Sequence, residues 1–356
     1  MEAAEAVGGA GDIPEEGVLD LLSSLVEQSL VVADRREDGP TRYRMLVPVR
    51  EYAEERLEQS GEAEETRRRH AEYCLTLARE AEWHLVAARQ VEWLDRLEAE
   101  HENMRAALAW SIERSAAETA LSLAASLWRF WSARGYQTEG RRWLTDALRL
   151  DASETPTAVL MVALFGAGRL AYEQGDYAAA RTLFVENLEV ARRLGDRNYI
   201  GGALTQLAHI ARLRGEYEEA GDLYGEGLAV RRELGQSRNI GISLHGMGSV
   251  ALAQGDYASA RQFLRESLSV FHQSGDVREV ATALRSLGDA ERLQGEHDPA
   301  LERYGEGLRL FEQQGDRQGI GLSLLGLGAL AQARGDQSRA EELYTRSLSL
   351  FQELST

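Results

Sequence analysis

The spacing of hydrophobic residues between positions 157 and 354 predicts helices throughout that stretch. Apolar side chains recur three and four residues apart, as in Ala180, Leu183, Phe184, Leu188 and Ala191. This spacing places them on one face of a helix, and the alternation typical of a strand is not seen there. A glycine follows each apolar run, and a left-handed glycine is a common helix terminator. These glycines occur every twenty residues, at 175, 195, 215, 235, 255, 275, 295, 315 and 335.

The true repeat is forty residues long, because alternate glycines begin different motifs. Gly175-Asp176-Tyr177, Gly215-Glu216-Tyr217 and Gly255-Asp256-Tyr257 are copies of one motif, and weaker copies begin at Gly295 and Gly335. Each period predicts two helices of about 18 residues joined by a tight turn. Such a hairpin cannot bury its own apolar faces, so successive hairpins must stack. We predict a solenoid of five units over residues 157–354.

Each unit has a small residue at its eighth position and, in most units, an aromatic residue at its twenty-fourth. Glycine inside a helix costs about 1 kcal/mol relative to alanine, so we expect a close helix approach to offset that cost. With alanine at position twenty and the Gly-Asp-Tyr turn, this pattern resembles the tetratricopeptide repeat family. The units have forty residues rather than the family's usual number of about 34, and they lack its terminal proline. The resemblance therefore implies a variant with longer helices. The residues at position eight are Gly168, Ala208, Gly248, Gly288 and Gly328, and those at position twenty-four are Phe184, Tyr224, Leu264, Tyr304 and Tyr344.

Tryptophan distinguishes the preceding region, because all six tryptophans lie between Trp83 and Trp143. We expect them to be core residues rather than a ligand cage. Residues 94–105 predict one amphipathic helix, Cys74 lies in a periodic helix as a predicted core residue, and Ala120–Leu150 look like a degenerate repeat. The predicted domains are a winged-helix-like segment at 1–60, a tryptophan-rich helical region at 61–150, and five repeats at 151–356 that begin with a linker, Asp151–Pro156.

Residues 1–60 combine helical and strand patterns. Two β-prone runs with a turn between them predict a hairpin, flanked by helices, which is the outline of a winged helix. The fold class is therefore mainly α, an α-solenoid of tetratricopeptide-like hairpins preceded by a small winged-helix-like α/β segment. The predicted elements are a remnant first helix at Glu2–Val7, a helix at Gly17–Gln28, strands at Leu30–Ala33 and Thr41–Leu46 around a turn at 37–40, and a helix at Val49–Gln59.

The order of motifs also resembles a larger arrangement. Residues within 19–31, Tyr43–Leu46, Arg50–Ala53 and Glu100–Leu108 look like the carboxy-terminal half of bacterial STAND-type ATPase regulators, which include the maltose activator and AfsR-like antibiotic regulators. The resemblance implies an upstream effector domain and nucleotide-binding domain, then a winged helix, then a sensing superhelix. It also implies that this chain is a fragment or a reduced relative. Many such proteins carry Met-His-Asp where Met45-Leu46-Val47 stands here, and leucine cannot hydrogen-bond a phosphate.

Composition narrows the chemistry. The 356 residues are 44% hydrophobic with five prolines, which excludes a disordered tail protein. All 40 basic residues are arginine, so no P-loop lysine or Schiff base is available, and Cys74 is the single cysteine. The formal charge of -18 disfavours nucleic-acid binding, and no apolar run reaches the roughly 18–20 residues of a membrane helix. We expect a cytoplasmic protein that is not an enzyme and binds no metal or cofactor.

One set of residues departs from this acidic background. In a repeat superhelix, positions five, nine and twelve of each first helix face the concave groove, and here several of them are cationic or can become so. Such a groove would attract an acidic peptide or an anionic small molecule. The alternative is that these residues pair with neighbouring Glu173 or Asp289, or are simply solvated. The candidate binding residues are Arg169, Tyr172, His209, Arg212, His245, Arg285, Asp289, Arg292 and Gln332.

The last predicted helix, Ala340–Leu354, has an apolar face that no further repeat covers. Solenoids normally end in a polar outer face. We therefore expect an exposed apolar edge, including Leu343, Leu348 and Phe351, that is covered by self-association or by a partner, or that marks a truncated chain.

These patterns predict a sensor and protein-interaction module of a STAND-type signalling or transcriptional regulator. Its expected partners are a protein, a peptide or a small anionic effector, together with an upstream nucleotide-binding domain if the chain is part of a longer protein. A free-standing repeat scaffold is one alternative. Another is a DNA-binding regulator that uses Arg35, Arg36, Arg42 and Arg44 near the hairpin, although the preceding helix at Gly17–Gln28 is apolar and acidic.

Overall fold

The computed structural model describes residues 2–9, 15–34, 41–150 and 155–354. The chain forms two compact units, residues 1–183 and 184–356. Helix α10 (Tyr177–Leu194) contains the boundary between them.

The first unit begins with the predicted helix, hairpin and helix. A short helix at the start confirms the predicted remnant, and the hairpin strands are antiparallel, with Val31 opposite Met45. Gly61, with a φ of 76°, ends the last helix of this segment. The candidate residues Arg35 and Arg36 and the predicted turn at 37–40 lie outside the described residues. The elements are α1 (Glu2–Gly8), α2 (Glu15–Glu27), β1 (Val31–Asp34), β2 (Arg42–Met45) and α3 (Val47–Ser60).

A helical core follows, built around α7, whose residues between Ala120 and Trp131 are almost all buried. Cys74 is buried as predicted, and Trp93, Trp128 and Trp131 are core residues. The expectation was wrong for Trp83, whose side chain is 79% exposed, because it lies off the face of α4 that carries the buried residues. The helices are α4 (Ala63–His84), α5 (Gln90–Ala99), α6 (His101–Glu113), α7 (Ala117–Arg134), α8 (Gln137–Leu150) and α9 (Ala158–Glu173). Residues 151–154 of the predicted linker lie outside the described part.

The single helix predicted for residues 94–105 is also wrong, because α5 ends at Ala99 and α6 begins at His101, with Glu100 between them. Glu100 has φ -100° and ψ 6°, outside the helical region. Its carboxylate accepts hydrogen bonds from Arg42 Nη1 at 2.9 Å and from Asn103 Nδ2 at 2.5 Å. The contact with Arg42 joins residues 58 positions apart, so local spacing could not reveal it.

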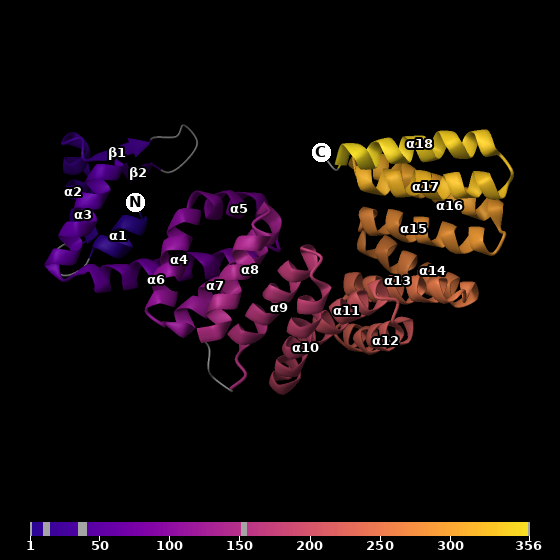
Figure 1. The fold of residues 1–356 in the computed structure, drawn as a ribbon, viewed down its shortest axis with the longest axis horizontal. Coiled ribbons are helices and arrows are strands. Elements are labelled where there is room, and N and C mark those ends of the chain that lie inside the picture. Colours follow the sequence, from indigo (N-terminus) through magenta and orange to yellow (C-terminus); the bar gives the residue numbers. More distant parts are fainter. Residues whose placement is uncertain (1, 10–14, 35–40, 151–154, 355–356) are drawn as a thin grey trace. The chain divides into compact units, whose positions relative to one another are not determined.

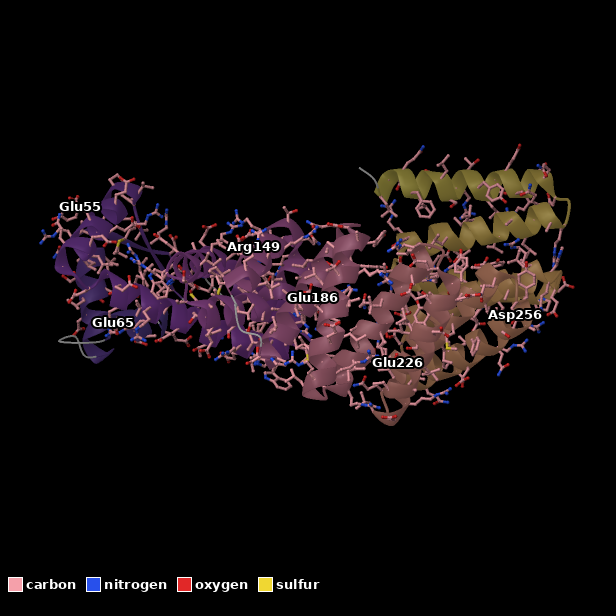
Figure 2. The ribbon with its side chains drawn as sticks, turned by 60° about the horizontal axis from the view of Figure 1, so that its bottom comes forward. Glu55, Glu65, Arg149, Glu186, Glu226 and Asp256 are labelled. Atoms are coloured by element: carbon pink, nitrogen blue, oxygen red, sulfur yellow. The ribbon has the colours of Figure 1, made fainter. Side chains whose placement is uncertain are left out.

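The second unit consists of stacked antiparallel helix pairs (Figure 1). Every glycine of the twenty-residue series has a positive φ, between 65° at Gly235 and 84° at Gly335, which confirms the predicted helix ends. Asp256, labelled in Figure 2, caps α14 by accepting a hydrogen bond from the backbone N–H of Ser259 at 3.1 Å. The helices are α11 (Arg197–Leu213), α12 (Tyr217–Glu233), α13 (Ser237–Gln254), α14 (Tyr257–Ser274), α15 (Val277–Leu293), α16 (His297–Gln314), α17 (Arg317–Ala333) and α18 (Gln337–Leu354).

Helix pairs approach closely at the predicted glycines. A Cβ atom on Gly288 would lie 3.0 Å from the ring of Tyr304, and one on Gly328 would lie 2.6 Å from the ring of Tyr344. The glycine at position eight therefore gives the ring at position twenty-four its space, as the sequence predicts.

Ion pairs between neighbouring repeats supplement this packing. Arg192 contacts Glu226 at 2.6 Å. The same kind of pair recurs forty residues later, where Arg232 contacts Glu266 at 2.7 Å. Glu226 is labelled in Figure 2. All four side chains are about half exposed, so each pair contributes little stability by itself.

The predicted apolar edge at the last helix is smaller than expected. Leu343 is buried, and the ring of Phe351 packs over Gly321. The expectation was therefore wrong for these two residues, because they cover the inner face of their own hairpin. Leu348, at 58% exposure, is the apolar side chain of the three that faces outward.

Among the described residues, no helix has the length and apolar character needed to cross a membrane. In the same parts of the chain, no group of three or more His, Cys, Asp or Glu side chains is arranged to hold a metal ion.

Candidate functional site: an arginine and histidine cluster on successive first helices

Six of the predicted binding residues lie on three successive first helices of the second unit. These six residues, here called the A-helix cluster, occupy positions five, nine and twelve of their repeats. Residues four and seven apart share one face of a helix. The forty-residue period repeats that face in each unit, which places the cluster on neighbouring helices. The members are His209 and Arg212 on α11, His245 on α13, and Arg285, Asp289 and Arg292 on α15.

Hydrogen bonds link most of the cluster into a chain. His245 Nε2 lies 2.9 Å from the hydroxyl of Ser286, and Arg285 Nη2 lies 3.5 Å from the same hydroxyl. Arg285 Nη1 donates to Asp289 Oδ2 at 3.1 Å. Arg292 Nε lies 3.3 Å from the hydroxyl of Tyr304, completing a path from α13 through α15 to α16.

Tyrosine hydroxyls from the second helices also reach this face. Tyr304 donates to Asp289 Oδ1 at 2.6 Å, and the Tyr224 hydroxyl lies 2.8 Å from His209 Nδ1. Both rings are fully buried, so the packing of the rings determines where the hydroxyls lie. Sequence reasoning assigned these tyrosines to packing only. The signal that it missed is that position twenty-four carries a hydroxyl here, whereas Phe184 and Leu264 do not.

The A-helix cluster carries more positive than negative side chains. Burial lowers the pKa of His245 to about 3, and the nearby positive charges of Arg285, His209 and Arg212 act in the same direction. His245 is therefore neutral near neutral pH. Arg212 forms neither a hydrogen bond nor an ion pair with the residues that the structure describes. The cluster contains three guanidinium groups and one carboxylate, on a chain whose formal charge is -18.

The remaining predicted residues have other neighbours. Arg169 Nη2 pairs with Glu173 at 2.9 Å, and its guanidinium lies 5.7 Å from the centre of the Tyr172 ring. These residues belong to the first unit, whereas the A-helix cluster belongs to the second. Gln332 on α17 accepts a hydrogen bond from the Tyr344 hydroxyl at 3.0 Å. The alternative of internal pairing is thus found at Arg169 and, with Asp289, at Arg285 and Arg292, whose Nη2 lies 4.0 Å from Asp289 Oδ1.

Of the hairpin arginines that could contact DNA, the two that the structure describes, Arg42 and Arg44, are engaged within the chain. Arg42 Nη1 pairs with Glu100, and its Nη2 donates to the carbonyl oxygen of Ala99 at 2.5 Å. Arg44 Nε pairs with Asp34 at 2.8 Å. These contacts reduce the number of guanidinium groups available to phosphates.

A cavity lies in the first unit, between α3, α4 and α6. This cavity has a volume of about 510 Å³ and is lined by Arg67, His70, Trp110 and Arg114, among others. Arg67 and Glu58 both line the cavity and form an ion pair at 2.6 Å. No sequence signal pointed to it, because its lining comes from helices that are separated along the chain.

Family comparisons agree with this architecture. The model of the tetratricopeptide repeat matches four overlapping stretches, 159–233, 199–273, 239–313 and 279–353, which together cover more than half of the chain. The chain belongs to the tetratricopeptide repeat family. A model of the winged helix-turn-helix domain matches residues 1–58. The repeat array and the winged helix that the sequence predicts are therefore both confirmed.

Two curated relatives are mycobacterial proteins that are provisionally named HTH-type transcriptional regulators. They are Rv0890c of Mycobacterium tuberculosis and Mb0914c of Mycobacterium bovis. Each is 35% identical to this tetratricopeptide repeat protein over 212 residues, which make up 58% of this chain and 24% of the relative. The chain thus matches about a quarter of the length of these relatives.

Solved structures share the fold at low identity. One is PH0952 from Pyrococcus horikoshii, a signal transduction ATPase with numerous domains (STAND) that has a tetratricopeptide repeat sensor. Its TM-score is 0.55 at 16% identity, and the match covers 98% of this chain and 60% of that one. The apo form of RapI has a TM-score of 0.59 at 12% identity, covering 80% of this chain and 99% of that one. A Rap protein complexed with competence and sporulation factor has a TM-score of 0.54 at 15% identity, covering 80% and 93% respectively.

Proposed function

We propose that this chain is the sensor and protein-interaction region of a STAND-type transcriptional regulator. The observation that carries the proposal is the order of its parts, a winged helix followed by a tetratricopeptide array. That order has a fold counterpart over 98% of the chain in a STAND protein with a tetratricopeptide repeat sensor. The names of the mycobacterial relatives support a role in transcriptional regulation.

In this proposal, a protein, peptide or small anionic effector binds on the face of the first helices. Each repeat contacts chiefly its neighbours, so an occupant that bridges several first helices changes how the hairpins stack. The change in stacking then acts on an upstream nucleotide-binding domain. The chain itself performs no catalytic step in this scheme, and with no lysine it cannot supply a P-loop lysine.

DNA binding through the hairpin has less support. Arg42 and Arg44 are held by Glu100 and Asp34. Helix α2 carries acidic residues and no arginine, whereas a helix that reads bases usually presents arginine or amide side chains.

The proposal is tested on the whole gene and the whole protein. We expect a Walker-type phosphate-binding loop in frame upstream of the codon for Met1. We also expect that the complete protein hydrolyses ATP at a rate that changes when Gly246→Ala disturbs the repeat stacking. An upstream frame without such a loop would overturn the proposal in favour of a free-standing repeat scaffold. Tight binding of this chain to DNA in a gel shift at physiological salt would overturn it in favour of a DNA-binding regulator.

A further inference from the structure

We propose that the end of α12 and the start of α13 form a binding site for a small monovalent oxyanion, such as a short carboxylate, which pairs with the Arg231 guanidinium. The site lies where one repeat joins the next, at the ends of two consecutive helices, and it contains no residue of the A-helix cluster. The inference goes beyond the proposed function, because it requires neither an effector on the first helices nor an upstream domain.

Arg231 takes the place of a phenylalanine in the repeat pattern. Its side chain packs over Gly201, where a Cβ atom would lie 2.7 Å from Nε, just as the ring of Phe271 packs over Gly241 in the next repeat. Arg231 is only 7% exposed, so the chain buries a positive charge where an apolar ring would fit. The three repeats that follow have phenylalanine at this position, namely Phe271, Phe311 and Phe351.

The buried guanidinium has no counter-charge. Arg231 forms no ion pair with the residues that the structure describes, and its Nη1 donates a hydrogen bond to Oε1 of Gln236, a neutral amide. Its Nε is buried without an acceptor, whereas Nη2 makes no hydrogen bond in the described parts of the chain and stays open to solvent. Burial lowers the pKa of Arg231, but an arginine stays charged near neutral pH. A buried charge without a partner is costly, so an anion that pairs with it would stabilise the fold.

A carboxylate is also missing from the start of α13. Gln236 precedes this helix at a position where three other repeats have an aspartate. Each of those aspartates caps the following helix by accepting a hydrogen bond from a backbone N–H group, whereas the Gln236 side chain forms no such bond. The backbone N–H groups of Arg238 and Asn239 therefore have no acceptor within the described residues. An uncapped helix N-terminus attracts negative charge. The three aspartates are Asp196, Asp276 and Asp316.

The amide oxygen of Gln236 marks the place that an anionic oxygen would take. This oxygen accepts hydrogen bonds from Arg231 Nη1 on α12 and from Asn239 Nδ2 on α13, the latter at 3.0 Å. Both donors bind a charged oxygen more strongly than an amide oxygen, so a carboxylate can displace the Gln236 side chain. The ligand must be small, because little of the guanidinium is accessible. One negative charge suffices, because one guanidinium lacks a counter-charge.

The test compares the melting temperature of the full chain in sodium formate and in sodium gluconate at the same concentration, followed by circular dichroism. The two salts screen surface charges equally, but gluconate is too bulky for a small site. We expect the wild type to melt about 2 °C or more higher in formate, because a ligand that binds the folded chain stabilises it. Arg231→Met should lose this difference. Equal melting temperatures of the wild type in the two salts would overturn the inference, as would a difference that Arg231→Met retains.

A matched control is the next residue on α12. Arg232 is about half exposed and pairs with Glu266 at 2.7 Å. Arg232→Met removes the same charge from the same turn of helix, and we expect it to keep the difference between formate and gluconate. Loss of the difference in both Arg231→Met and Arg232→Met would overturn the specific site and leave only a general charge effect.

A second variant keeps the inference testable even if Arg231→Met does not fold. Gln236→Asp restores the residue of the other repeats and places a carboxylate beside Arg231 and at the N-terminus of α13. We expect this variant to melt at a higher temperature than the wild type in gluconate, and to gain nothing further from formate, because its own carboxylate fills the site. A Gln236→Asp protein that responds to formate as strongly as the wild type would show that formate acts elsewhere.

Discussion

Gly246 of α13 lies against the face of Tyr224 of α12, so closely that a Cβ atom on Gly246 would be 2.3 Å from Cζ of the ring. Tyr224 belongs to one repeat and Gly246 to the next. The hydroxyl of the same ring reaches His209 on the A-helix face, 2.8 Å from Nδ1. A single tyrosine therefore both joins two repeats and positions a member of the candidate site.

This contact predicts that Gly246→Ala destabilises the repeat array. The added methyl group would overlap a fully buried ring, and such overpacking typically costs about 1–3 kcal/mol. The control is Gly225→Ala on α12, where a Cβ atom would meet nothing within 4 Å. Alanine there should stabilise the helix by about 0.4–1 kcal/mol. Urea unfolding followed by circular dichroism measures both variants, and a Gly246→Ala protein as stable as the Gly225→Ala protein would contradict the prediction.

His245 should make stability depend on pH in a defined direction. Its pKa is about 3 in the folded chain and ordinarily 6.5, so below about pH 6.5 the unfolded chain binds a proton that the folded chain does not. The contribution of His245 to the free energy of unfolding is therefore complete above about pH 6.5 and is lost as the pH falls toward 3. The groups that face it are Arg285, His209, Arg212 and the Ser286 hydroxyl.

We therefore expect the free energy of unfolding of the wild type to fall more steeply than that of His245→Gln between about pH 6.5 and pH 4.5. The difference approaches about 1 kcal/mol per pH unit. Urea unfolding at several pH values measures it. Parallel stability profiles for the two proteins would contradict the prediction, because they would mean that His245 takes up its proton at the same pH in the folded and the unfolded chain.

In the first unit, Glu139 joins α8 to α6, and its removal should be costly. Its carboxylate accepts hydrogen bonds from Arg105 Nε at 2.7 Å and Trp143 Nε1 at 3.2 Å, and it lies 3.1 Å from His101 Nε2. The bond to Arg105 is the main cause that holds the pKa of Glu139 below its ordinary value of 4.5. We expect Glu139→Gln to reduce stability by about 1–3 kcal/mol at neutral pH.

The control for Glu139 is Glu102, which also contacts Arg105 but is 85% exposed, whereas Glu139 is 16% exposed. Glu102→Gln should cost less than about 0.5 kcal/mol. Because the folded pKa of Glu139 is lowered, its contribution is present above pH 4.5 and is lost as the pH falls through the folded value. The gap in melting temperature between the wild type and Glu139→Gln should therefore narrow in acid. A gap that is unchanged by pH would contradict the assignment.

Local sequence determined the helices, their ends and their pairing. Glycine every twenty residues ends a helix because it alone adopts the left-handed conformation at little cost, and each such glycine has a positive φ. The small residue at position eight indicated the approach within a hairpin, as Gly288 and Tyr304 show. The face that carries Arg212, His245 and Arg285 also followed from helical periodicity alone.

The tertiary structure decided everything that depends on which distant residues meet. The contact of Gly246 with Tyr224 crosses from one repeat to the next, and the break at Glu100 is accompanied by a contact with Arg42, 58 positions away. Periodicity gives the face of a helix that a residue occupies but not the partner that it meets there. The pairing of Arg285 with Asp289 is a contact between residues four apart on α15, which helical spacing allows, whereas it took the stacked hairpins to show that Arg212 has no hydrogen-bond or ion-pair partner among the described residues.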